Sequence, residues 1–144
     1  MRLLWLIGLI AGSAPVAAQQ SIPDLKGSWS GELRSLVYGA NAYHPGPQTP
    51  SDPPRIREFQ VFVDVEGQDG NLLWGKTWIG DGPKDPFAWA IGADGKTIVG
   101  SDSDGSHFLT ILSADRMERC YTHDGTSPSR SIVATCGVIE RLTP

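Results

Sequence analysis

A chain of 144 residues with 12 Lys and Arg residues against 16 Asp and Glu residues carries a net charge of −4. Its basic residues are scattered and form no stripe, which argues against nucleic acid or an anionic membrane surface as the partner. The length suits one domain with its own hydrophobic core and is too short for two ordinary domains.

The N-terminus has the three-part layout of a secretory signal peptide. Arg2 supplies a positive charge, residues 3–10 form a short apolar run, and Val16-Ala17-Ala18 offers the small residues of a cleavage site. The apolar run is shorter than the roughly 20 residues that cross a bilayer. We expect residues 1–18 to be removed, leaving one domain over 19–144 in a secreted or periplasmic protein without an integral membrane span. The alternative is a buried N-terminal strand or helix.

Asp-Gly pairs divide the rest of the chain, and between apolar runs they are a strong hairpin signal because both residues tolerate positive φ. The pairs begin at Asp69, Asp81, Asp94, Asp104 and Asp124. The runs between them are rich in Val, Ile, Thr, Trp and Phe, and no long stretch has helical periodicity. We predict eight strands, over 27–37, 57–66, 71–79, 86–92, 96–102, 107–113, 115–122 and 131–141. This all-β pattern with short loops predicts a small, closed, antiparallel up-and-down β-barrel.

Residues 39–56 form the one long connection, between the first and second predicted strands. They are rich in Pro and lack periodicity. Loops of this length in compact domains are usually either functional or disordered. If the segment is functional, Tyr43 and His44 are its candidate contacts, lying over the mouth of the barrel as a lid that excludes water.

Alternation of side chains assigns the strand faces. One face of 57–66 carries Phe59, Val61, Val63 and Val65, and one face of 86–92 carries Phe87, Trp89 and Ile91. In 71–79 the set with Trp74 and Trp78 competes with the set with Leu73 and Ile79, so the face of this strand stays open.

The last hairpin carries the two cysteines, Cys120 and Cys136. An even pair in an exported protein favours a disulfide, and a metal site there would have His123 nearby but no fourth ligand. If the cysteines face each other across antiparallel strands, the same register brings together Arg116 with Glu140, Asp115 with Arg141, and Met117 with Ile139. Two of these pairs are of opposite charge, which suits cross-strand neighbours. The register also places Arg119 on the inner face, opposite Gly137.

The first predicted strand opens with Gly27-Ser28-Trp29. A Gly-x-Trp at the start of an eight-stranded meander resembles the calycin superfamily, the lipocalins and avidins. That resemblance implies that Trp29 packs across the barrel base against a basic residue near the end of the last strand, for which Arg141 is the matching candidate. It further implies an open-ended barrel able to hold a small molecule.

No catalytic, cofactor or metal site is predicted. Histidines 44, 107 and 123 could join a Ser-His-Asp set on paper, but the sequence has no nucleophile elbow. Asp102-Ser103-Asp104-Gly105 resembles part of a calcium loop. If this segment is aligned with an EF-hand loop, Gly100 and Ile111 occupy positions where acidic ligands belong, so we interpret residues 102–105 as a turn.

We therefore expect a non-enzymatic binding protein that holds a small apolar or amphipathic ligand. An anionic end would lie at Arg119, because a buried guanidinium needs a partner, and an apolar body would lie against Trp74 and Trp89. In one alternative Arg119 pairs with an internal acid, although Asp64 and Glu66 of the second strand face outward; in another it reaches water near a barrel mouth. In further alternatives the tryptophans fill the interior, or an outward Trp74 and Trp78 bind glycan. The competing function is a protein-interaction module, an inhibitor or envelope accessory factor, with a filled barrel. A cavity of roughly 300 Å³ or more would favour ligand binding.

Overall fold

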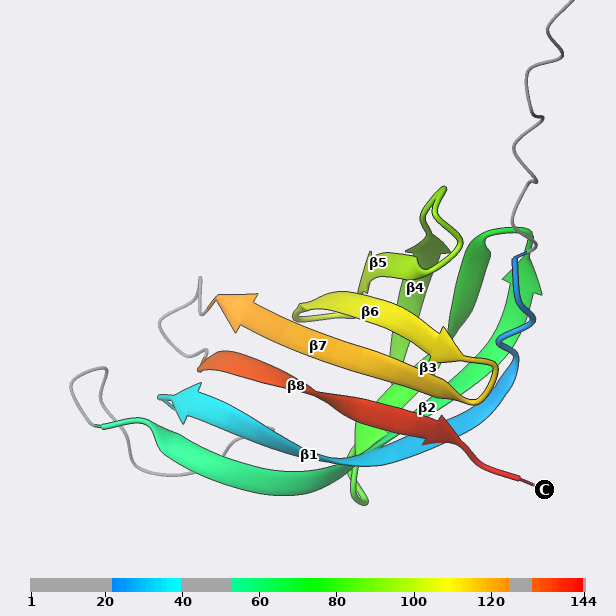
Figure 1. The fold of residues 1–144 in the computed structure, drawn as a ribbon. Coiled ribbons are helices and arrows are strands. Elements are labelled where there is room, and N and C mark those ends of the chain that lie inside the picture. The colour runs from blue at the N-terminus through cyan, green and yellow to red at the C-terminus, as the bar shows by residue number, and fades with distance from the viewer. Residues whose placement is uncertain (1–21, 40–52, 125–130, 144) are drawn as a thin grey trace, which may run out of the picture.

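The computed structural model describes residues 22–39, 53–124 and 131–143. Within them lie eight strands: β1 (Gly27–Tyr38), β2 (Arg55–Asp69), β3 (Leu72–Ile79), β4 (Asp85–Ile91), β5 (Thr97–Ser101), β6 (Ser106–Ser113), β7 (Arg116–Asp124) and β8 (Ile132–Arg141). Each strand pairs with the next, and β8 returns to β1, so the predicted closed antiparallel barrel is confirmed (Figure 1). Residues 1–18, Tyr43 and His44, for which a leader and a lid were predicted, lie outside the described residues. No helix in the described part of the chain is long and apolar enough to span a membrane.

The orientation of β3 answers the question that its sequence left open. Leu73, Gly75 and Thr77 are buried and face the interior, whereas Trp74 is 48% exposed on the outer wall. The ring of Trp74 lies over Gly67 of β2, where an added Cβ would come within 2.1 Å of it. Trp74 therefore cannot contact a ligand held inside the barrel, which corrects the expectation for this residue.

The β7–β8 hairpin has the predicted register. Cys120 and Cys136 form a disulfide with their Cα atoms 4.1 Å apart. The pairing brings together Arg116 with Glu140, Met117 with Ile139, and Arg119 with Gly137. A bridge that closes a loop of this size contributes about 3 kcal/mol in the chain-entropy model.

The two ends of the barrel differ in what fills them. We call the end at the start of β1 and the end of β8 the base, and the opposite end, where β5 is joined to β6, the mouth. The base half is packed by apolar side chains, none more than 2% exposed: Trp29, Val63, Val65, Leu73, Ile91, Ile98, Leu109, Met117 and Ile139. Polar inward residues gather in the mouth half instead, so any space for a ligand lies there.

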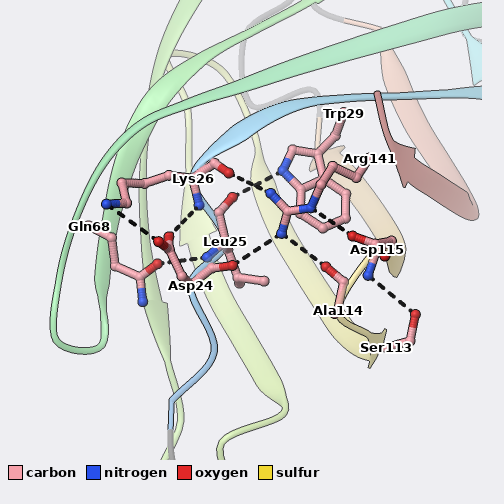
Figure 2. Close-up of polar contacts among 9 residues, drawn as sticks. All are labelled: Asp24, Leu25, Lys26, Trp29, Gln68, Ser113, Ala114, Asp115 and Arg141. Carbon is pink, nitrogen blue, oxygen red and sulfur yellow. Dashed lines mark hydrogen bonds and ion pairs between the residues drawn. The ribbon is translucent and has the colours of Figure 1, made fainter. Parts of the chain in front are cut away.

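Arg141 closes the base by stacking on Trp29, as Figure 2 shows. Its guanidinium carbon lies 4.3 Å from the centre of the indole ring. The same guanidinium donates to the carbonyl oxygens of Lys26, Asp24 and Ala114 and pairs with Asp115 at 3.0 Å. The predicted contact between Trp29 and Arg141 is thus confirmed, and it joins the first strand to the last.

We expect Arg141→Ala to lower the free energy of unfolding by on the order of 2 kcal/mol, because a cation–π contact and several charge-assisted hydrogen bonds are lost together. Arg116→Ala is the matched control. Arg116 is an exposed arginine that makes one surface ion pair with Glu140, and such pairs contribute at most about 1 kcal/mol. Denaturant unfolding of the two variants compares them, and equal losses would contradict the role of Arg141 as the closing residue.

Candidate functional site

A cavity of about 370 Å³ lies in the mouth half of the barrel. Its walls come from the starts of β2, β4 and β8, the ends of β3 and β7, and the turn between β5 and β6. The lining is mixed, with the charged residues Arg57, Asp85, Asp102, Asp104 and Arg119 alongside the apolar residues Phe59, Trp78, Ile79 and Val133. The cavity exists because the apolar packing stops at mid-barrel, and the sequence above that level supplies polar inward residues.

The inner face of β7 carries Arg119 on the cavity wall. This residue is only 4% exposed, and its guanidinium carbon lies 5.4 Å from the centre of the Tyr121 ring. The buried Nε of Arg119 has no hydrogen-bond acceptor among the described residues. Gly137, which faces Arg119 across the sheet, does not provide room for it, because Leu33 occupies that space.

Burial lowers the pKa of Arg119 to about 10, although the nearby carboxylate of Asp102 favours the charged form. The group therefore stays protonated at neutral pH and forms a desolvated positive charge on the cavity wall. A desolvated guanidinium with an unused donor is suited to bind a carboxylate or phosphate, since charge-assisted hydrogen bonds are the strong ones.

Asp102 and His107 form a buried pair across the turn between β5 and β6. The Nε2 atom of His107 lies 2.8 Å from Asp102 Oδ2, and His107 is fully buried. The other oxygen of Asp102 accepts hydrogen bonds from the backbone N–H groups of Asp104 and Gly105.

Burial is the main cause that lowers the pKa of His107, and the positive charge of Arg119 adds to it. Burial also opposes ionisation of Asp102, but its hydrogen bonds from His107 and the backbone outweigh it, and the pKa of Asp102 lies below its usual value. At neutral pH we therefore assign an ionised Asp102 and a neutral His107 that donates through Nε2. Its Nδ1 is then a buried acceptor with no partner among the described residues.

Tyr121 holds this cluster together. Its hydroxyl donates to Asp104 Oδ1 at 2.7 Å, and its ring meets His107 edge-on at 5.1 Å. The ring lies so close to Gly105 that an added Cβ there would come within 2.4 Å of it. Burial and the bond to Asp104 raise the pKa of Tyr121, so the phenol stays neutral and acts as a fixed donor beside Arg119.

The residues expected to contact a ligand divide into three groups. Arg119 lines the cavity, as predicted. Trp89 is inside the barrel and 3% exposed, but it stacks on Phe87 below the cavity and is not part of its lining. Trp74 lies on the outer wall. The predicted aromatic wall of Trp74 and Trp89 is therefore absent from the described lining, and Phe59 provides aromatic surface near the mouth instead.

Two of the alternative interpretations can be decided as well. Trp78 does face outward with Trp74, but its ring is stacked on Phe62 at 5.4 Å and covered by Lys84 at 4.1 Å, which leaves Trp74 as the exposed ring of the two. Residues 102–105 form the predicted turn. Among the described residues, no group of three or more His, Cys, Asp or Glu side chains is placed to hold a metal ion.

The role of Asp102 was not predicted from the sequence. The available signal was its position just after a strand and five residues before His107, so that both side chains flank one tight turn. The alternation of side chains also places His107 on the inner face, beside Arg119 and Tyr121 of the neighbouring strand. These positions together would have predicted the cluster.

Comparisons with known proteins do not assign this chain to a family. No protein-family model matches the chain, and no curated protein matches it. Among solved structures, the S-type phycobiliprotein lyase from Guillardia theta is 12% identical, over 83% of this chain and 89% of that one, with a TM-score of 0.35.

Proposed function

We propose that this protein is a non-enzymatic, exported binding protein of calycin type, which holds a small anionic molecule with an apolar body in the mouth half of its barrel. The observation that carries the proposal is Arg119, a 4% exposed cation whose Nε has no acceptor among the described residues. Leaving a buried donor unsatisfied costs about 1–3 kcal/mol, and more for a charged group. A bound carboxylate or phosphate removes that cost.

The size of the cavity supports a ligand over a filled barrel. Ligand pockets usually measure about 300–1,000 Å³, and this one, at about 370 Å³, is at the small end of that range. A protein-interaction module with a solid barrel, the competing function, gives no reason for a cavity with a buried charge in its wall.

The ligand enters with its anionic end first. Leu109 lies beside Arg119 on β6, and Met117 lies two residues nearer the base on β7; both are at most 2% exposed, so an apolar tail has no room toward the base. The apolar body therefore lies toward the mouth, against Phe59 and Val133. This reverses the usual expectation that the apolar end of an amphiphile is the more deeply buried one.

A catalytic role for the Asp102–His107 pair has less support. His107 is fully buried and is not part of the cavity lining, so its imidazole does not reach the space in which a substrate would lie. A general base must come within hydrogen-bond distance of the proton that it removes. We therefore assign the pair a structural role: His107 holds Asp102 in place, and the carboxylate of Asp102 favours the charged form of Arg119.

Titration with octanoate and with octan-1-ol tests the function, because the two share a chain and differ in charge. Calorimetry gives the affinities, with the tryptophan fluorescence of the protein as a second readout. We expect octanoate to bind more tightly than octan-1-ol, and Arg119→Gln to weaken octanoate by about tenfold to a hundredfold, as expected for one charge-assisted hydrogen-bonded contact.

Arg116→Gln, on the outer face of the same strand, is the control and should bind octanoate as the wild type does. Equal affinity for the acid and the alcohol, or unchanged binding in Arg119→Gln, would refute the proposed anion site.

Export is the second part of the proposal. It is supported by the leader-like residues 1–18 and by the Cys120–Cys136 disulfide, since disulfides persist mainly outside the reducing cytoplasm. Intact-mass analysis of the natively expressed protein should find a chain that begins at Gln19 and carries no free thiol. A cytoplasmic protein that begins at Met1 with both thiols reduced would contradict it.

A further inference from the structure

Three side chains set the charge balance inside the mouth half of the barrel. Arg119 contributes one positive charge, Asp102 one negative charge, and neutral His107 none, so the buried set is balanced when the cavity is empty. Their proximity follows from shared contacts. Asp102 is hydrogen-bonded to His107, and the imidazole of His107 and the guanidinium of Arg119 both lie against the ring of Tyr121. An anion placed at Arg119 would leave this desolvated set one negative charge in excess, which is costly in a low-dielectric site.

We propose that the cavity takes up one proton together with each bound anion, and that His107 is the group that accepts it. This inference rests on the proposed function, because the proton is taken up only when an anion binds at Arg119. With the proton on His107, two positive and two negative charges restore the balance.

The contacts favour His107 over the other groups near it. Protonation of His107 turns its 2.8 Å hydrogen bond to Asp102 into an ion pair, whereas protonation of Asp102 would weaken the three hydrogen bonds that this carboxylate accepts. Asp104 already accepts from Tyr121. The Nδ1 of His107 is free to take the proton, since it has no partner among the described residues.

Three other titratable residues line the cavity toward its mouth, and one of them, His123, is buried at 6% exposure. Arg57 of β2, Asp85 of β4 and His123 of β7 are all in the lining, toward the mouth. Trp89 of β4, the other ring against His107 at 5.5 Å, does not titrate. His123 is consequently the one competing histidine in the described cavity wall, and the experiment has to separate it from His107.

The sign of the coupling follows from the same charges. Burial and the charge of Arg119 lower the pKa of His107 in the empty protein. A bound anion offsets Arg119 and raises that pKa, so the anion binds more tightly as pH falls. By linkage, the affinity gains at most about tenfold for each pH unit when one proton accompanies each anion.

Calorimetry with octane-1-sulfonate tests the proposal, because this probe keeps its charge from about pH 5 to about pH 8, the range in which histidine titrates. Titrations in two buffers of different ionisation enthalpy give the number of protons taken up. We expect net uptake of up to one proton per anion and tighter binding at the lower pH. The uptake should disappear in His107→Gln and persist in His123→Gln.

The outcomes separate the two proposals. Absence of binding at every pH overturns the proposed function and the inference with it, while binding with equal affinity and no proton uptake overturns the inference alone. Uptake that persists in His107→Gln and disappears in His123→Gln assigns the proton to the wrong histidine and also overturns it. Should His107→Gln not fold, NMR titration of the wild-type imidazoles decides: the pKa of His107 must rise when the sulfonate saturates the protein.

Discussion

The contact between Arg141 and Trp29 is the constraint on which the rest of the structure depends. It joins the last strand to the first, and its guanidinium gathers three backbone carbonyls that would otherwise be left at an open end. With the base sealed, the apolar residues above it pack into a continuous core. The cavity lies at the opposite end, among the polar inward residues of the mouth half.

This asymmetry explains how a barrel of modest size can contain both a core and a cavity. Small eight-stranded barrels hold little more than their own side chains, and here the core occupies the base half. In the mouth half, Arg119, Asp102 and His107 replace apolar side chains, and their mutual contacts hold them in place. The protein accepts a desolvated charge in the mouth half, where an apolar side chain would carry no such desolvation cost.

Much of this architecture could be predicted from particular residues. Asp-Gly turns and alternation located the strands. The cysteine pair set the register of the last hairpin, and the opposite-charge pairs of Arg116 and Asp115 supported it. The alternation of side chains along the last hairpin also placed Arg119 on the inner face of the barrel. The face of β3 could not be predicted, because apolar residues occupy both of its faces and a bulge in β2 shifts the register beside it. The Asp102–His107 bond was equally inaccessible, since it depends on how a turn directs one side chain, and the depth of Trp89 depends on where the core stops.

The central claim is that Arg119 serves a ligand and not the fold, and the stability of the ligand-free protein tests it most directly. Replacing a buried charge by an apolar side chain of similar length removes a desolvation cost. Arg119→Met combined with Asp102→Asn removes both charges and leaves neither uncompensated, so this double variant should unfold at higher denaturant concentration than the wild type, with a gain on the order of 1 kcal/mol or more in the free energy of unfolding. A variant that is clearly less stable than the wild type would show that the guanidinium holds the barrel together, and would contradict the account.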